Sequence, residues 1–365
     1  MKITRPTLLV DEQRCRSNIR RMVEKARRNQ VVLRPHFKTH QSHTIGRWFR
    51  EEGVTTCTVS SIRMAAYFAE DGWTDITVAF PLNYLEAGEI NRLAERIKLN
   101  LLVVSAVALQ ELAKQLAHPV HCFIEIDTGY HRTGVDSSDK KTQDEIVSVI
   151  ESNPRLTFAG LLTHAGQSYQ CRSGIEILTV HQQTTQVMKR VGSRLLSKFP
   201  EMVLSVGDTP TCSKATDFSG VQEIRPGNFV FYDVMQCRIG SCSEDQVAIV
   251  LACPVVATYP ERGELVVHGG GVHLAKDFLK EEDGSLSYGK VVRLSENGWQ
   301  LPSLPMHVKS VSQEHGIIRA TKEECEQVRP GDVLGIIPVH SCMTADVMGE
   351  YYTLTGEKIV MMPKT

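Results

Sequence analysis

Short apolar runs alternate with longer charged stretches from residue 10 to about residue 235. Eight of these runs have the length and the β-branched or apolar content of strands. They are VVLRP (31–35), TTCTVS (55–60), DITVAF (75–80), LNLLVVS (99–105), HCFIEID (121–127), LTFAGLLTH (156–164), MVLSVG (202–207) and VQEIRP (221–226). The stretches between them, such as SIRMAAYFAEDG (61–72) and IEILTVHQQTTQVMKRVGSRLLSKF (175–199), are amphipathic and typical of helices. Eight strands that alternate with helices predict parallel βαβ units closed into a (β/α)8 barrel, an α/β fold.

The pattern changes after Asp233, where strand-like runs follow one another with turn residues between them and no convincing helix. These runs are VAIVLACPVVATYP (247–260), GELVVHGGG (263–271), MHVKSVSQEHGII (306–318) and DVLGIIPVH (332–340). Such a series predicts an antiparallel β-domain. We therefore expect a barrel domain over residues 11–235 and a β-domain over residues 236–365. The opening run PTLLV (6–10) could be a strand of either domain and could join the second.

The overall composition excludes several classes of partner. The 365 residues include 41 Lys and Arg against 42 Asp and Glu, which gives a formal net charge of −1. No basic stripe or acidic tail is present, so neither nucleic acid nor a membrane is expected as a partner. No signal peptide or membrane-spanning run is recognisable, and ten cysteines without a CxxC pair indicate reduced thiols. We expect a soluble cytoplasmic protein.

Polar and glycine-rich residues gather where the predicted barrel strands end. Lys38 follows the first strand, and DTGYHR (127–132) follows the fifth. HAGQSY (164–169), GDTPT (207–211) and RPGN (225–228) follow the sixth, seventh and eighth strands. Because barrels of parallel strands carry their active sites at the carboxyl ends of the strands, these segments predict a site on that rim.

Lys38 lies in VVLRPHFKTHQSH (31–43), at the mouth of an apolar strand and among histidines and an arginine. Partial burial and nearby positive charge lower the pKa of a lysine and expose a nucleophilic amine. The residues alone support this reading and that of a surface lysine at a strand end about equally.

Seven segments together give the chain a resemblance to a known family. They are RPHFKTH (34–40), DTGYHRTGV (127–135), THAGQSY (163–169), GDTPT (207–211), EIRPGNFVFYD (223–233), SQEHG (312–316) and PVHSC (338–342). The chain resembles the alanine racemase-like pyridoxal-phosphate enzymes, in the branch that holds D-serine dehydratase and D-threonine aldolase. The resemblance implies a pyridoxal 5'-phosphate-binding barrel followed by a β-domain, and a homodimer with its sites near the subunit interface.

The resemblance also implies roles for the residues on the barrel rim. Lys38 is the expected Schiff-base lysine and, once freed, the catalytic base. The phosphate is expected at Gly207, Asp208 and Thr209 on one side and at Gly227 and Asn228 on the other, although GDTPT alone would favour an ordinary turn. Arg132 and Arg225 are expected near the pyridoxal ring, and His164 and Tyr169 are expected to pack against the cofactor or hydrogen-bond it.

His340 and Cys342 are the expected ligands of a divalent metal. At strand spacing, positions i and i+2 point to the same side, and an imidazole with a thiolate suits zinc. By itself the H-x-C pattern favours a buried cysteine beside a histidine. The resemblance reverses that preference, because the family has its metal at this position.

A pyridoxal-phosphate enzyme with this metal is expected to be a lyase of β-hydroxy D-amino acids. A Lewis acid assists loss of a β-hydroxyl, so α,β-elimination from D-serine, D-threonine or 3-hydroxy-D-aspartate to a keto acid and ammonia is preferred. Retro-aldol cleavage to glycine and an aldehyde is the alternative, and the cysteine favours elimination because the aldolases usually carry an aspartate there. A racemase or a non-catalytic cofactor-binding protein is less well supported, since the latter proteins lack the second domain.

Two segments depart from the family pattern. HGGGVHLAKD (268–277) has His273 where a lysine is often found, and MTAD (343–346), after the metal pair, lacks a common asparagine. Both departures fall on the expected substrate side of the site. They leave the identity of the substrate open.

Overall fold

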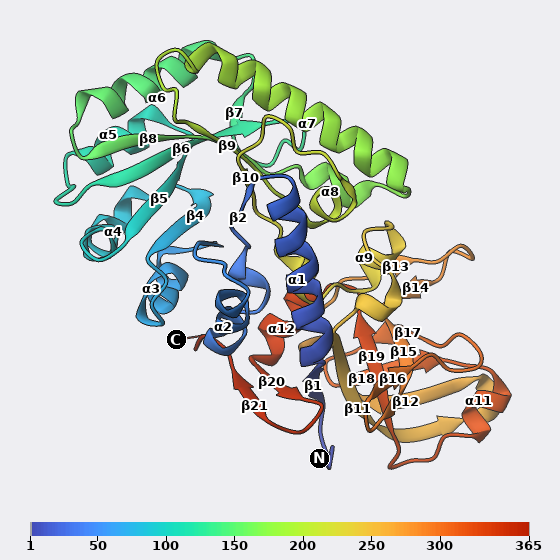
Figure 1. The fold of residues 1–365 in the computed structure, drawn as a ribbon. Helices are drawn as coiled ribbons and strands as arrows, with labels where there is room; N and C mark the ends of the chain where they lie inside the picture. The colour runs from blue at the N-terminus through green and yellow to red at the C-terminus, as the bar shows by residue number, and fades with distance from the viewer. Residues whose placement is uncertain (1, 365) are drawn as a thin grey trace.

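A computed structural model describes residues 2–364 of the chain, which form a parallel barrel and an antiparallel β-domain (Figure 1). The barrel strands are β2 (Val32–Leu33), β3 (Cys57–Val59), β4 (Asp75–Pro81), β5 (Lys98–Val103), β6 (Val120–Asp127), β8 (Leu156–Thr163), β9 (Val203–Val206) and β10 (Glu223–Ile224). They are ordered β2-β10-β9-β8-β6-β5-β4-β3, all pairings are parallel, and the short β7 (Val135–Asp136) pairs with β6. A bridge between His36 and Thr58 joins the two edges of the sheet. The predicted fold class is confirmed.

Helices cover the outside of the barrel. They are α1 (Glu12–Arg28), α2 (His43–Glu51), α3 (Ile62–Glu70), α4 (Ala87–Ala94), α5 (Ala106–Ala113), α6 (Lys140–Ser152), α7 (Gly174–Leu195) and α8 (Thr209–Lys214). Polar side chains mark where several of them begin: Asp11 accepts from Arg14 N at the start of α1, and Ser173 accepts from Glu176 N at the start of α7. The apolar stripe of α1, with Ile19 and Val23, is buried against the barrel core. Among residues 2–364, no helix combines the length and apolar composition needed to cross a membrane.

The second domain is a sheet of mostly antiparallel strands. Its members are β11 (Ile249–Tyr259), β12 (Glu264–His268), β15 (Gly289–Ser295), β16 (Gly298–Gln300), β17 (His307–Val311), β18 (His315–Arg319), β19 (Val333–Pro338), β20 (Glu350–Thr353) and β21 (Lys358–Val360). The path β12-β18-β17-β15-β19-β11 returns to β12, so these six strands close on themselves. β13 (Leu279–Lys280) and β14 (Leu286–Ser287) form a separate hairpin.

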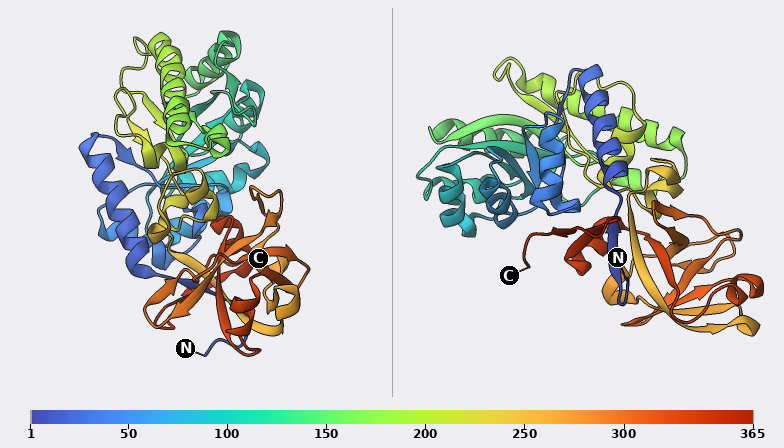
Figure 2. Two further views of the ribbon diagram at one scale, coloured as in Figure 1. Left: turned by 90° about the vertical axis from the view of Figure 1, so that its right-hand side faces the viewer. Right: turned by 60° about the horizontal axis from the view of Figure 1, so that its bottom comes forward.

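The first strand of the chain lies in this second sheet. β1 (Thr7–Val10) pairs antiparallel with β11, where Thr7 faces Ala252, and parallel with β20, where Leu9 faces Tyr352. The chain then enters the barrel through α1. Because β1 and α1 are continuous, the two domains are joined at both the N-terminal strand and the segment after Asp233, and the two views of Figure 2 show them in contact along this side.

The expectation that no helix follows Asp233 is wrong. The structure has α9 (Val234–Arg238), α10 (Gly271–Leu274), α11 (Lys322–Glu326) and α12 (Ser341–Met348). The sequence of α12, SCMTADVM, has no apolar stripe of helical period, so its pattern did not predict a helix. Tertiary contacts stabilise it instead: Thr344 and Ala345 are fully buried, Thr344 Oγ1 donates to Leu274 O of α10 at 2.9 Å, and α12 also packs against the turn Phe37–Thr39 of the barrel.

Candidate active site

A cavity of about 280 Å³ lies at the carboxyl ends of the barrel strands, where the second domain faces the rim. All the residues that the sequence indicated for the site line this one cavity. They are Lys38, Arg132, His164, Tyr169, Gly207, Asp208, Thr209, Arg225, Gly227, Asn228, His340 and Cys342. The structure thus brings together residues from the segments that follow five barrel strands and from the start of α12. The chemical roles of these residues stay predictions.

Lys38 is positioned by the residue before it. Phe37 is fully buried, and its ring contacts the rings of Phe49, Phe68 and Trp73 at centroid distances of 5.2, 4.9 and 4.8 Å. With Phe37 anchored in the core, the turn Phe37–Thr39 directs Lys38 into the cavity. The amine is open to the cavity but is surrounded by protein atoms, and this burial lowers the pKa of Lys38, with Arg132 adding to the effect and Cys342 opposing it.

The lowered pKa of Lys38 predicts how covalent capture of pyridoxal phosphate should vary with pH. Only the neutral amine attacks an aldehyde, so a lower pKa makes the reactive form abundant at lower pH. We expect the rate of capture by the apoenzyme to rise with pH, with a midpoint below the value of about 10.4 of an ordinary lysine. Stopped-flow absorbance of the apoenzyme mixed with the cofactor measures it. A midpoint at or above the ordinary value would contradict the burial argument.

The local geometry expected for His340 and Cys342 is wrong, although their side chains do meet. β19 ends at Pro338, and His340 caps the N-terminus of α12, so the pair does not lie along one face of a strand. The chain turns there because Ser341 N donates to Asp233 Oδ2 at 2.9 Å. On the far side of that turn, the imidazole of His340 and the thiolate of Cys342 are joined by a hydrogen bond and by opposite charge.

Each member of this pair stabilises the charged form of the other. Burial opposes the charged form of His340, but the hydrogen bond and the charge of Cys342 outweigh it and raise the pKa of His340 to about 9. Burial also opposes the thiolate of Cys342, yet His340, Thr39 and Lys38 hold the pKa of the thiol below its ordinary value. A metal would displace the proton of His340 and meet a thiolate and a neutral imidazole, in a cavity with room for further ligands. Zinc accepts this donor set, so the residues fit a metal.

Buried polar contacts hold the turn that carries His340 and Cys342 in place. Asp233 accepts hydrogen bonds from Asn228 Nδ2 at 2.7 Å and from Ser341 N at 2.9 Å. Asn228 Nδ2 also lies 3.5 Å from Cys342 Sγ. Behind His340, the carboxylate of Asp277 is 3.7 Å from Nδ1, an arrangement that orients histidine ligands in metal sites. Asp233 ends the segment EIRPGNFVFYD and Asp277 ends HGGGVHLAKD, but nothing in the sequence distinguishes them from other acidic residues.

His164 presents a neutral imidazole to the cavity. Its Nδ1 is 2.7 Å from the carbonyl oxygen of Gly207, to which it donates as the protonated nitrogen. Burial, with the charge of Arg132, lowers the pKa of His164 to about 3. The rings of Tyr130 and Tyr169 lie on either side, with centroids 5.8 and 6.2 Å away. A neutral ring held in this way is suited to pack against a flat cofactor.

The loops after β9 and β10 line the cavity and pack closely against their neighbours at two glycines. A Cβ atom at Gly207 would lie 2.7 Å from Arg225 Cβ, and one at Gly227 would lie 2.9 Å from the carbonyl oxygen of His36. Thr209 Oγ1 and Asn228 Oδ1 are buried and lack a hydrogen-bond partner within the protein. The hydroxyl of Thr209 can donate to an anion, so this part of the cavity, lined by two glycines, fits the phosphate of pyridoxal phosphate.

Asp208 has a structural task in this part of the cavity. Its Oδ1 accepts from Thr211 N at 2.7 Å and from Ser168 Oγ at 2.8 Å, and its Oδ2 accepts from Thr211 Oγ1 at 2.6 Å. Both oxygens of the carboxylate are therefore engaged in capping α8 and holding the loop after β8. Asp208 shapes this part of the cavity through these contacts.

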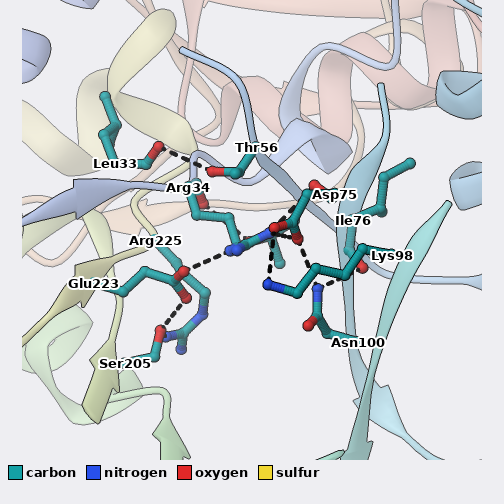
Figure 3. A network of polar contacts seen from close by, with 11 residues as sticks. Leu33, Arg34, Thr56, Asp75, Ile76, Lys98, Asn100, Ser205, Glu223 and Arg225 are labelled. Atoms are coloured by element: carbon teal, nitrogen blue, oxygen red, sulfur yellow. Dashed lines mark hydrogen bonds and ion pairs between the residues drawn. The ribbon is translucent and has the colours of Figure 1, made fainter. Parts of the chain in front are cut away.

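A network of polar contacts inside the barrel holds the side chain of Arg225 (Figure 3). It donates to Thr163 O at 2.6 Å and to Ser205 Oγ, and Ser205 Oγ in turn donates to Glu223 Oε1 at 2.5 Å. Glu223 also accepts from Arg34 Nε at 2.6 Å. Burial lowers the pKa of Arg225 to about 10, with the carboxylate of Glu223 opposing the shift. The contacts fix the guanidinium that lines the floor of the cavity.

Removal of Glu223 should destabilise the fold strongly. Its side chain and that of Arg34 are 4% and 6% exposed, so Glu223→Ala leaves a buried guanidinium with one carboxylate fewer. We expect a loss of about 3–5 kcal/mol, seen as a lower denaturant midpoint. Glu111→Ala, which breaks the exposed pair with Lys114, is the matched control and should cost about 0–1 kcal/mol. Equal midpoints for the two variants would rule out the role of the buried network.

Sequence reasoning missed several residues that line the cavity. They are His36, Thr39, Ala79, Leu102, Glu125, Tyr130, Leu162 and Met235. His36, Thr39 and Tyr130 belong to segments that the sequence did highlight. The available signal was that each lies within two residues of a predicted site residue, Lys38 or Arg132. Glu125 is inside β6, where alternation predicts a side chain that points into the barrel. Burial raises the pKa of Glu125, and Thr133 Oγ1 donates to it at 3.0 Å.

The fold is that of a class of cofactor enzymes, in which a barrel and a β-domain enclose a cavity. Comparison with known proteins shows which family of this class the chain belongs to. Residues 10–234 match the family "Alanine racemase, N-terminal domain", and residues 248–354 match the "Putative serine dehydratase domain". The first match covers more than half of the chain. The protein therefore belongs to the alanine racemase N-terminal domain family, in the branch that carries the serine dehydratase domain.

Individual relatives are similar over nearly the whole chain. D-serine dehydratase of Dictyostelium discoideum is 27% identical over 98% of this chain and 94% of its own length. D-threo-3-hydroxyaspartate dehydratase of Delftia sp. (strain HT23) is 29% identical over 96% of this chain and 94% of its own. 3-Hydroxy-D-aspartate aldolase of Paracoccus denitrificans (strain Pd 1222) is 23% identical over 98% of this chain and 90% of its own length.

The fold of the Delftia dehydratase has been solved and superposes closely. The superposition covers all of this chain and 98% of the Delftia chain, with a TM-score of 0.90 and 27% sequence identity. Variants of one histidine and of one cysteine two residues further along have also been solved, and the cysteine variant is described as metal-free. The same spacing separates His340 and Cys342 in this chain.

Proposed function

We propose that the protein is a pyridoxal-phosphate- and metal-dependent lyase that removes water from a β-hydroxy D-amino acid, with D-serine as the first candidate substrate. The observation that carries the proposal is the meeting of Lys38 with the pair His340 and Cys342 in one cavity. A base and a set of metal ligands are what elimination of a poor leaving group requires. The dehydratases similar to this chain over its whole length support the same reaction.

The residues of the cavity would hold the cofactor at its two ends. Lys38 would bind it covalently, while Gly207, Thr209, Gly227 and Asn228 would bind its phosphate. His164 would pack against the ring. When bound, pyridoxal phosphate withdraws electrons from the α-carbon of an amino acid and makes its hydrogen acidic.

Lys38 is the group placed to move the α-proton. Its lowered pKa makes the neutral amine more abundant at physiological pH than that of an ordinary lysine. Arg132 and Arg225 also line the cavity, but guanidinium groups serve as hydrogen-bond donors and not as bases. Lys38 would therefore both bind the cofactor and act as the general base. The positive charge of Arg132 lowers the pKa of Lys38 and so favours the neutral amine, which is the form that accepts a proton.

His340 and Cys342 would hold a divalent metal, and we propose zinc. A zinc ion held there would supply a Lewis acid for the β-hydroxyl, which is otherwise a poor leaving group. The negative charges of Asp233 and Asp277 raise the pKa of His340 in the metal-free pair and would stabilise a cation in the same position. Two protein ligands leave coordination positions for water and substrate.

We further propose that the enzyme acts as a homodimer. Large apolar side chains are exposed near the site: Phe80 (59% exposed) and Met343 (43%) follow Ala79 and Cys342 of the cavity, and Phe278 (52%) follows Asp277, whose carboxylate is 3.7 Å from His340. Exposed apolar side chains of this size near a site support association with a second copy. Light scattering should give about twice the chain mass of 40.7 kDa, and a mass equal to one chain would refute the dimer.

The cytoplasm is the proposed compartment. All ten cysteines are free thiols in the structure, and seven of them are buried. Thiols in this state are expected where the surroundings are reducing.

Products measured on a panel of substrates test the proposed reaction. D-serine, D-threonine and 3-hydroxy-D-aspartate should each be assayed for keto acid and ammonia on one side and for glycine and aldehyde on the other. We expect keto acid and ammonia, with the highest kcat/KM for D-serine. Faster formation of glycine than of keto acid from any of the three would replace the dehydratase by an aldolase, which the similarity to the Paracoccus aldolase keeps as the second candidate.

A further inference from the structure

The segment HGGGVH (268–273), which departs from the family pattern, carries two histidines that the proposed reaction does not use. His268 ends β12, and His273 lies on the one-turn helix α10. Both imidazoles face Glu314, in the turn between β17 and β18. Oε2 of Glu314 is 3.2 Å from Nε2 of His268 and 3.6 Å from Nε2 of His273.

Backbone contacts fix the two segments against each other. Gly269 N donates to Glu314 O at 2.9 Å, Gly271 N donates to Ser312 O at 2.7 Å, and His268 pairs with His315 in the sheet. The approach is so close that a Cβ atom at Gly270 would lie 2.4 Å from the carbonyl oxygen of Gln313. Glycine is therefore required there, and the three side chains are brought together by the sheet itself.

The three side chains offer a complete set of protein ligands for a transition metal. One ligand atom from each lies within 4.8 Å of the other two, so a single ion can reach all three. Two imidazoles and a carboxylate form a set that zinc uses with one water in tetrahedral sites. The side chain of Glu314 is 52% exposed and that of His268 is 39% exposed, so water can supply the remaining position.

Protonation does not prevent binding at His273. Burial lowers the pKa of His273, so the imidazole is neutral at neutral pH. Gly270 N lies 3.3 Å from Nδ1, a long hydrogen bond that favours the proton on Nε2. Coordination through Nε2 moves that proton to Nδ1 and gives up this contact, which reduces the affinity but leaves the ligand set intact.

We propose that His268, His273 and Glu314 form a second divalent-metal site, for a transition metal such as zinc, with no ligand in common with His340 and Cys342. The site is linked to the candidate active site by the chain that follows it. Leu274 O accepts from Thr344 Oγ1 of α12 at 2.9 Å, and Asp277 lies 3.7 Å from His340. An ion at the second site holds this segment against α12, so its role is to support the wall of the active site.

Zinc stoichiometry of the holoenzyme tests the proposal independently of the reaction. After chelation and equilibrium dialysis against zinc, elemental analysis should find two ions per wild-type chain. The double variant His268→Gln/His273→Gln should bind one, and His340→Ala/Cys342→Ala should also bind one. An unchanged zinc content in His268→Gln/His273→Gln would overturn the second site, whether or not the enzyme is active.

Matched variants guard this test against loss of folding. His315→Gln removes an exposed histidine that pairs with His268 but lies outside the cluster, and it should keep two ions. Glu314→Gln, an exposed and nearly isosteric change, should weaken zinc binding at least about tenfold in the His340→Ala/Cys342→Ala background. Zinc should raise the thermal midpoint of that background. Full-affinity binding by its Glu314→Gln derivative would contradict the assignment.

Discussion

Lys38→Ala should lower kcat for the dehydration of D-serine by at least about 10⁴-fold, the upper end of the contribution of a general base. The variant removes both the covalent attachment of pyridoxal phosphate and the base that takes the α-proton. No other lysine is among the residues that line the cavity, so no amine is placed to replace it. The absorbance band of the bound cofactor should disappear together with the activity.

Lys38→Arg is the matched control for this experiment. It keeps a positive charge and a long side chain beside Phe37, so the fold should survive, yet a guanidinium neither attaches the cofactor nor accepts a proton. Borohydride reduction of the wild type followed by peptide mapping should place the pyridoxyl group on Lys38. A label on another lysine, or substantial turnover by Lys38→Ala, would refute the role of this residue.

Removal of the metal should be the second large effect. His340→Ala or Cys342→Ala should lower kcat by about 10³-fold, because a Lewis acid at the leaving group supplies several kcal/mol of transition-state stabilisation. Chelation of the wild type should have the same result, and zinc should reverse it. The cofactor band and the circular dichroism spectrum should remain, since Lys38 and the residues proposed to bind the phosphate belong to the barrel and not to α12.

Two variants separate the effect of losing the metal from a general loss of folding. Cys237→Ala changes a half-buried thiol of α9 that does not line the cavity and should retain activity. His268→Gln/His273→Gln should still lose activity on chelation and regain it with zinc. If wild-type enzyme stripped of metal dehydrates D-serine at its normal rate, the metal has no part in the reaction.

The barrel and the composition of its rim could be predicted because they rest on local patterns. Alternation of strands and helices specifies the parallel sheet, and every strand of such a sheet ends at the same rim. Residues as distant in sequence as Lys38 and Asn228 could therefore be assigned to one cavity. The clearest case is the turn after β2, where Phe37 is apolar and buried and the polar residue beside it faces the cavity.

Features that depend on contacts between domains were not predictable from the sequence. α12 has no helical pattern of its own and is stabilised by its position against the barrel. The turn that joins His340 to Cys342 requires the carboxylate of Asp233, which comes from the segment that leaves the barrel. The cluster of His268, His273 and Glu314 likewise needs the register of β12 on β18, since 41 residues separate His273 from Glu314 along the chain.

The most direct test of a metal-assisted elimination in this cavity is the yield of pyruvate and ammonia from D-serine, measured on one preparation before chelation, after it and after zinc is restored. We expect pyruvate and ammonia in equal amounts, loss of both on chelation, and recovery of both with zinc, with no glycine at any stage. Glycine as the main product, or pyruvate formation that is indifferent to the metal, would contradict this expectation.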